Sequence, residues 1–189
     1  MTEHHTIFGA VESGDLASVE RYVADGIDVD VRDKRDSTPL SWASSYGRLD
    51  IVRFLVERGA DVNSQYHAGN TPLIVASWEG HGDVVQFLLD HGAGVHVKNR
   101  GGDTALAWAA EHGHTDVVRQ LLDAGADINS RNVNGVTALG FASEHNHLHT
   151  VEHLLRMGAE VEELTVKLAT DESHSEVAEI LHRARQRET

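Results

Sequence analysis

The chain has 189 residues, no cysteine, few aromatic residues and no long apolar run. Without cysteine it can have no disulfide framework, no thiol nucleophile and no cysteine-based zinc site, and we expect a reducing, cytoplasmic (intracellular) location. No apolar segment reaches the length of a membrane span, and the N-terminus lacks both the basic start and the apolar stretch of a signal peptide. These absences predict a soluble protein outside the membrane.

Basic residues are also scarce, because 16 Lys and Arg accompany 30 Asp and Glu, for a formal net charge of −14. Such a charge opposes binding to nucleic acid and to anionic lipid and favours basic partners. A second interpretation is that the charge only maintains solubility.

Motifs for catalysis are missing as well. The sequence has no glycine-rich phosphate loop between strand and helix, no His-Glu-x-x-His zinc helix and no glycine-flanked serine elbow. We therefore expect neither enzymatic activity nor a cofactor.

What the chain does have is a strict period of 33 residues, and we call a set of positions separated by this interval a column. One column holds five glycines and another holds four threonines: Gly26, Gly59, Gly92, Gly125 and Gly158, and Thr38, Thr71, Thr104 and Thr137. A fixed period of this length indicates a solenoid whose units bury their apolar faces against one another. With 40% hydrophobic residues, the chain can bury a core as one elongated domain.

Each repeat contains the signals of two helices. Thr38 suits a helix N-cap and Pro39 the first helical position, so the first helix, helix A, is predicted to begin at residue 39. Gly47 is suited to end it, and Asn146 takes the same place in the last copy, as the usual substitute for a left-handed glycine. A second helix, helix B, carries apolar residues at helical spacing and stops at Gly59.

Between two such repeats lies a polar stretch, residues 60–70 in one copy, which is too short for another packed helix. It predicts an extended turn, which we call a finger. The tail from residue 163 breaks the period, because Val177, Ile180 and Leu181 form a helix B face about seven residues early and without a preceding finger. We expect this tail to cap the solenoid.

The motifs Ser-Thr-Pro-Leu at 37–40, Asn-Thr-Pro-Leu at 70–73, Gly-His at 80–81 and 113–114, and Gly-Ala-Asp-Val-Asn at 59–63 resemble the ankyrin repeat. The resemblance implies an all-α solenoid of stacked helix-turn-helix units with β-hairpin or loop fingers. A single domain over 1–189 would comprise an N-terminal capping repeat (1–32), four full repeats (33–65, 66–98, 99–131 and 132–162) and C-terminal capping helices (163–189).

Aromatic side chains divide into two groups when the repeats are aligned. One column is always large and apolar and is assigned to the core: Trp42, Val75, Trp108 and Phe141. Tyr46, Tyr66 and Trp78 stand instead in columns that are otherwise polar. The ankyrin resemblance implies a concave binding surface of fingers and helix A faces, on which these three would be apolar anchors. The alternative is that each folds onto its neighbour.

Charged residues on the same surface are the remaining candidates for partner binding. The fingers concentrate basic residues, so a partner at the fingers is expected to be acidic, unless these bases only offset nearby aspartates. The candidates are Lys34, Arg35, His67, Glu79, Lys98, Arg100, Glu111, His112, Arg131, Glu144 and His145.

Fourteen histidines invite a metal hypothesis, with His112 and His145 the best-placed pair. We expect no metal site, because Gly-His is the ordinary inter-helix turn of the ankyrin repeat and stacked helices lie too far apart for ligands to converge on one ion. A response to pH is an alternative role for the histidines.

These features predict a monomeric, non-catalytic scaffold that binds another protein, and neither nucleic acid nor membrane. One alternative is a substrate of an asparaginyl hydroxylase, since Asn63 and Asn129 are similar to ankyrin sites modified by such an enzyme. Another is a regulatory or inhibitory subunit of an enzyme.

Overall fold

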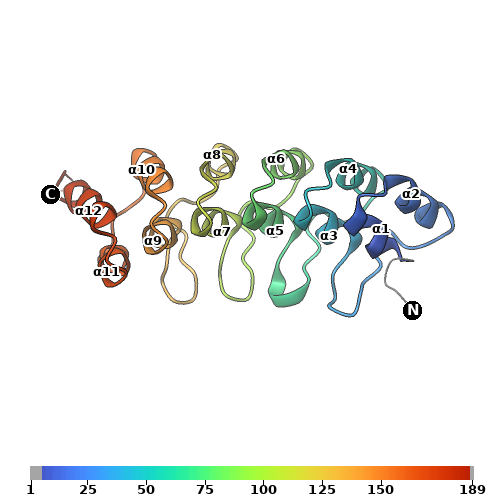
Figure 1. The fold of residues 1–189 in the computed structure, drawn as a ribbon, viewed down its shortest axis with the longest axis horizontal. Coiled ribbons are helices and arrows are strands. Elements are labelled where there is room, and N and C mark those ends of the chain that lie inside the picture. Colours follow the sequence, from blue (N-terminus) through green and yellow to red (C-terminus); the bar gives the residue numbers. More distant parts are fainter. Residues whose placement is uncertain (1–5, 188–189) are drawn as a thin grey trace. The chain divides into compact units, whose positions relative to one another are not determined.

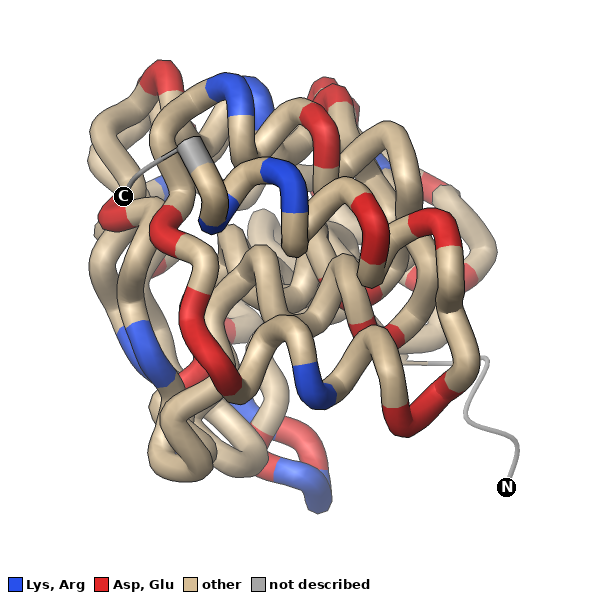
Figure 2. Tube along the Cα trace, turned by 90° about the vertical axis from the view of Figure 1, so that its left-hand side faces the viewer, with Lys and Arg blue, Asp and Glu red and all other residues tan. Residues whose placement is uncertain are grey.

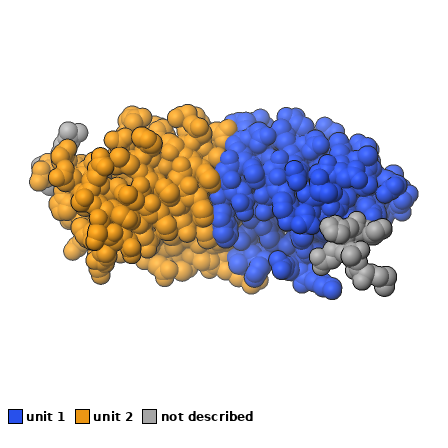
Figure 3. Space-filling view, viewed as in Figure 1, with its two compact units in different colours: residues 1–94 blue, residues 95–189 orange. Residues whose placement is uncertain are grey.

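The computed structural model describes residues 6–187, so the first five and the last two residues of the expected caps lie outside the described part. The chain divides into two compact units, unit 1 (residues 1–94) and unit 2 (residues 95–189), which Figure 3 colours separately. The prediction of a single domain over the whole chain stays a prediction.

The described residues contain twelve α-helices, one short 3-10 helix and no strand, which confirms the all-α fold. The fingers are loops and not β-hairpins, and the bridge between Tyr66 and Asn70 is isolated. The helices of unit 1 are α1 (Ile7–Ser13), α2 (Leu16–Ala24), α3 (Pro39–Ser45), α4 (Leu49–Glu57), η2 (His67–Gly69), α5 (Pro72–Glu79) and α6 (Gly82–Asp90). Those of unit 2 are α7 (Ala105–Glu111), α8 (Thr115–Asp123), α9 (Ala138–Glu144), α10 (Leu148–Arg156), α11 (Glu163–Asp171) and α12 (Ser175–Arg187).

Within each unit the helices form two layers (Figure 1). In unit 1, α1, α3 and α5 pack side by side as the helix A layer, and α2, α4 and α6 form the helix B layer. In unit 2 the corresponding layers are α7, α9 and α11, and α8, α10 and α12. The helix A layers are closely packed around a column of fully buried alanines: Ala43, Ala76, Ala109 and Ala142. A methyl side chain at this position allows neighbouring helices to approach closely.

The threonine column starts helix A, as predicted. Each threonine Oγ1 accepts a hydrogen bond from the backbone N–H three residues later, over 3.2–3.3 Å, at Thr38, Thr71, Thr104 and Thr137. In α3 the Ser41 Oγ also accepts the Thr38 N–H, which completes a capping box.

The turn between helices A and B needs a left-handed residue, and the glycine prediction is confirmed. Gly47 and Gly113 have φ of 64° and 70°, and Asn146 has φ of 58°. The histidine of the next repeat packs against the glycine, so that a Cβ on Gly113 would lie 2.6 Å from the His147 Nδ1. The His147 Nε2 in turn lies 2.8 Å from the Glu111 carbonyl oxygen. Glycine is therefore favoured at this position for two reasons: it adopts the left-handed conformation, and its missing side chain leaves room for the histidine ring of the next repeat.

The tail folds as the two capping helices α11 and α12. Its inter-helix turn is at Ser173, with φ of 61°, 27 residues after Asn146. The phase is therefore six residues early, close to the seven expected. Val177 and Leu181 are fully buried, whereas Ile180 is half-buried.

Candidate functional site

The first finger of unit 1 is held in shape by Asp33. Its Oδ1 accepts the backbone N–H groups of Arg35 and Ser37 at 2.8 and 2.9 Å, and its Oδ2 accepts the indole N–H of Trp42 at 3.0 Å. A carboxylate that closes its own turn in this way stabilises the loop. The finger is thus fixed both in itself and to helix α3.

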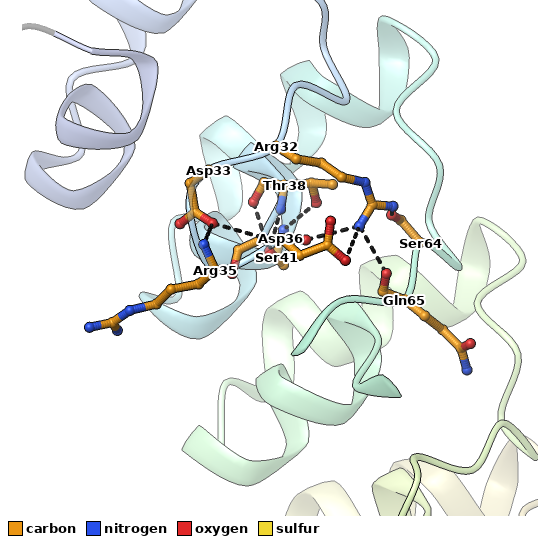
Figure 4. A network of polar contacts seen from close by, with 9 residues as sticks. Arg32, Asp33, Arg35, Asp36, Thr38, Ser41, Ser64 and Gln65 are labelled. Atoms are coloured by element: carbon orange, nitrogen blue, oxygen red, sulfur yellow. Dashed lines mark hydrogen bonds and ion pairs between the residues drawn. The ribbon is translucent and has the colours of Figure 1, made fainter. Parts of the chain in front are cut away.

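Arg32 connects this finger to the segment that leads into the next one (Figure 4). Its guanidinium donates to the carbonyl oxygens of Asp36 and Gln65 at 2.9 and 3.0 Å and to the Ser64 Oγ at 2.9 Å. The Asp36 carboxylate is 3.3 Å from the same group. In Figure 4 the Arg35 side chain extends away from this network.

Tyr66 occupies the column of Asp33, and the second finger differs for that reason. Asn99 and Asn132, in the same column, close their fingers through their side-chain oxygens just as Asp33 does. A tyrosine cannot do this. The second finger keeps the backbone hydrogen bond from the Tyr66 N–H to the Asn70 carbonyl and forms η2, in which Ala68 has φ of 58°.

The side chain of Tyr66 contributes instead to a cavity of about 210 Å³ between the two fingers and the end of α3. Aromatic rings and hydrogen-bonding groups line it: Arg35, Ser37, Ser41, Trp42, Ser45, Tyr46, Tyr66 and His67. We call this cavity the aromatic groove. It brings together four of the residues predicted from sequence to bind a partner: Arg35, Tyr46, Tyr66 and His67.

Trp42 is a functional candidate that the sequence analysis missed. We assigned it to the core, but its side chain is only half-buried and lines the aromatic groove. Its ring centroid lies 5.7 Å from those of Phe8 and Tyr46. Trp108 and Phe141, in the same column, are half-buried too, whereas Val75 is buried, so the aromatic members of this column lie at the edge of the core. The sequence did offer one signal for this position, because the indole N–H of a tryptophan needs a hydrogen-bond acceptor and therefore disfavours full burial among apolar side chains.

Of the three aromatics that stand in polar columns, Tyr66 is half-buried, as expected for the alternative in which the side chain folds onto its neighbours. Burial disfavours the phenolate and, together with the charges of Glu79 and Asp33, raises the pKa of Tyr66 well above its usual value. Tyr66 therefore remains a neutral hydrogen-bonding group in the groove.

Tyr46 and Trp78 are exposed, by 41% and 37%. The Tyr46 hydroxyl donates to the Glu12 carboxylate over 3.4 Å, and partial burial followed by the Glu12 charge raises the pKa of Tyr46. Trp78 lies at the end of α5, next to the exposed Glu79. Large aromatic surface is thus accessible on two successive helix A ends of unit 1.

The finger cations differ in availability. Lys34 and Arg35 are exposed, and neither side chain has an ion pair or hydrogen bond within the described residues. Arg100 is exposed in the same way. In contrast, the Lys98 Nζ donates to the Arg131 carbonyl at 2.9 Å, and Arg131 pairs with Glu162 at 2.9 Å. The last two therefore connect repeats of unit 2.

The helix A ends of unit 2 carry titratable groups in place of Tyr46. His112 and His145 are exposed, and each Nδ1 lies 3.1 Å from the carbonyl oxygen four residues earlier. Burial raises the pKa of Glu111, which lies near both histidines, Asp103 and Glu144. The described residues contain no group of three or more His, Asp or Glu side chains arranged to hold a metal ion.

The two finger asparagines connect successive loops. Asn63 accepts the Gly94 N–H at 2.8 Å and donates to the Gly92 carbonyl at 3.1 Å, and Asn129 accepts the Glu160 N–H at 3.0 Å. These amides thus have a structural role. None of the helices in the described residues is both long and apolar enough to cross a membrane.

Comparison with protein families matches the model described as ankyrin repeats (3 copies) over residues 7–99 and 93–165. A comparison with curated proteins gives no match. Ankyrin repeats generally mediate protein–protein interaction, and the family is typically a non-catalytic scaffold. The capped helix pairs, the left-handed turns and the family match agree, and the chain belongs to the ankyrin repeat family.

Proposed function

We propose that this protein is a non-catalytic scaffold that binds a partner protein through the helix A and finger surface of unit 1. The observation that carries the proposal is the aromatic groove, in which Trp42, Tyr46 and Tyr66 meet at the base of a finger with an unpaired arginine. Trp78 adds an exposed ring on the next helix A.

Aromatic side chains of this kind suit recognition because they bring large apolar area with few rotatable bonds. Hydrogen bonds also hold the groove in place before binding. One joins the Trp42 indole to the Asp33 carboxylate, and others join the Arg32 guanidinium to Gln65 and Ser64. A preorganised surface loses little conformational entropy on association. The proposed partner segment places an apolar side chain in the groove and a carboxylate near Lys34 and Arg35.

The experiment compares proteins captured from the source cells by the wild type and by the double variant Tyr46→Ala, Trp78→Ala, with quantitative mass spectrometry. We expect at least one abundant partner to fall by about tenfold or more, since two exposed interface aromatics are removed. Thermal unfolding is expected to change little, because both side chains are exposed.

Val133→Ala is the matched control, because Val133 is 72% exposed on a finger of unit 2 and its loss removes apolar surface elsewhere. Capture by this variant should equal that of the wild type. Retention of every captured protein by the double variant would show that the aromatic surface of unit 1 is not the binding site.

A further inference from the structure

A cavity of about 510 Å³ lies in unit 2 between the end of α10, the loop that follows it, and α12. We call it the terminal groove. Its lining comes from two sides, with Leu155 and Ala159 on one and Ile180 and Ala184 on the other. Arg156, Gly158 and Arg183 complete the lining. None of these residues belongs to the helix A and finger surface.

The groove exists because α12 does not end where a helix B ends. The 27-residue offset between the turns at Asn146 and Ser173 makes Arg185 the counterpart of Gly158, the glycine after α10. At Gly158 the chain turns with φ of 91°, whereas α12 continues as a helix to residue 187.

In earlier repeats, each loop after helix B is bonded to the loop of the next repeat, as in the hydrogen bonds of Asn63 to Gly94 and of Asn129 to Glu160. Because α12 takes the place of such a loop, the loop at 158–160 is adjoined by a helix and not by another loop. The space between them is the terminal groove.

The groove has an apolar floor and a basic rim. Leu155, Ile180 and Ala184 are half-buried, so part of each side chain remains accessible. Arg156 and Arg183 are exposed. Arg183 pairs with Glu179 over 2.8 Å, but both side chains are largely exposed, and such a pair is weak and easily exchanged.

The neighbourhood of the groove extends both properties. Met157, which follows Arg156, is 49% exposed. The exposed His182 and Arg185 add basic groups on α12, although Figure 2 shows acidic as well as basic positions close to the C-terminal end of the chain. The lining of the groove thus holds two arginines and no carboxylate, on a chain whose net charge is −14.

We propose that the terminal groove binds an acidic, amphipathic peptide segment of a partner protein. Apolar side chains of the segment occupy the floor, and its carboxylates pair with Arg156 and Arg183, which arginine does well through its planar fork. The net charge of the chain opposes an anionic lipid surface, whereas a short peptide meets only the local basic rim. This proposal is independent of the function proposed for unit 1.

The test uses the full chain, immobilised and panned against a phage-displayed library of random 12-residue peptides at low salt. We expect enriched peptides to carry Asp or Glu beside apolar residues spaced three or four apart. A synthetic copy of the most enriched peptide is then titrated by fluorescence anisotropy. Arg156→Glu, Arg183→Glu should weaken its binding at least tenfold, and added salt should weaken it in the wild type.

Two further variants separate the groove from general charge. Lys167→Glu, on the exposed face of α11, makes the same charge reversal as each arginine substitution, but outside the groove, and should bind normally. Ala184→Trp fills the groove and should abolish binding, with circular dichroism melting to verify folding. Tyr46→Ala, Trp78→Ala should have no effect, which distinguishes this site from the surface of unit 1.

Three results would overturn the proposal. The first is enrichment of peptides without acidic residues, or of none. The second is equal affinity of the enriched peptide for the wild type and the double arginine variant. The third is another occupant: a dimer in light scattering that Ala184→Trp abolishes assigns the groove to a second copy, and sedimentation with phosphatidylserine vesicles that needs Arg156 and Arg183 assigns it to lipid.

Discussion

One column of helix B differs sharply between the two units. In the two full repeats of unit 1 it holds Phe54 and Phe87, which are 8% and 7% exposed. The guanidinium carbon of Arg58 lies 4.6 Å from the ring centroid of Phe54, and that of Arg53 lies 4.7 Å from that of Phe87. In unit 2 the same column holds Gln120 and His153, whose buried Oε1 and Nε2 atoms have no hydrogen-bond partner among the described residues.

At the end of helix A the contrast is confined to one repeat: Tyr46 of unit 1 corresponds to His112 and His145 of unit 2, but Glu79 of unit 1 stands in the same column. In the helix B column, the full repeats of unit 1 thus have aromatic rings where those of unit 2 have an amide and an imidazole. Buried aromatic area stabilises at any pH, whereas a buried histidine stabilises only while it stays neutral. The comparison therefore predicts units that respond differently to mutation and to pH.

The largest effect is expected from Phe87→Ala. Loss of a buried ring and of its contact with Arg53 should lower the free energy of unfolding by about 3 kcal/mol. Gln120→Ala, at the same position in unit 2, should lower it by less than about 1 kcal/mol. Urea denaturation measures both, and equal losses would show that the column contributes alike in the two units.

The next effect is that of Gly113→Ala, which should lower the free energy of unfolding by about 2 kcal/mol. The added Cβ would stand at φ of 70° and 2.6 Å from the His147 ring. Gly125→Ala is its control, because φ is 87° there but nothing lies within 4 Å of the new Cβ. If the two losses were equal, the histidine contact would contribute nothing beyond backbone strain.

His153→Phe should stabilise the protein by about 1 kcal/mol at pH 7.5, because it replaces an unsatisfied buried nitrogen by the ring that unit 1 has at this position. Differential scanning calorimetry would register a higher melting temperature. A lower one would mean that the site of His153 cannot accept the shape of phenylalanine.

The smallest effect is a dependence of stability on pH. Burial, followed by the charges of Arg119 and Arg156, lowers the pKa of His153 below 6.5, and burial chiefly lowers that of His147. As the pH falls through 6.5, the unfolded chain binds protons that the folded chain does not, so the free energy of unfolding decreases.

The decrease should appear in urea denaturation between pH 7.5 and 5.5. His153→Phe should reduce the change of the free energy of unfolding with pH. Val56→Ala, a substitution in unit 1 that removes no titratable group, should leave this pH dependence unchanged. The raised pKa of Glu111 acts in the opposite direction at lower pH. A slope that is identical in the wild type and His153→Phe would contradict a neutral, buried His153.

The sequence predicted those features that depend on neighbouring residues. The cap at Thr38 and the left-handed turn at Asn146 each follow from a residue type and its position in the repeat, and both are confirmed. Burial at the site was harder to predict. Tyr66 turns into the groove because it cannot close its own finger, and Trp42 lies at the core edge because its indole reaches Asp33.

The finger cations show a second physical reason why the sequence alone could not predict the whole site. Arg131 and Arg100 look alike in sequence, yet Arg131 pairs with Glu162, 31 residues away, while Arg100 is exposed. Such a partner is a neighbour only once the repeats have stacked. The terminal groove likewise depends on the residue at which α12 ends. The shortened interval between the last two repeats, which is visible in the sequence, does not determine that residue.

Hydrogen bonds between loops set which lengths of chain the fold tolerates. Arg32 reaches Gln65 and Lys98 reaches Arg131 over the same 33 residues. Inserting or deleting one residue inside a repeat would change the spacing of the hydrogen bonds that span that repeat, whereas gaining or losing a whole repeat would keep the 33-residue spacing between neighbouring repeats. The six residues missing before α11 lie beyond the last of these contacts. Variation in length is therefore expected in whole repeats or at this end.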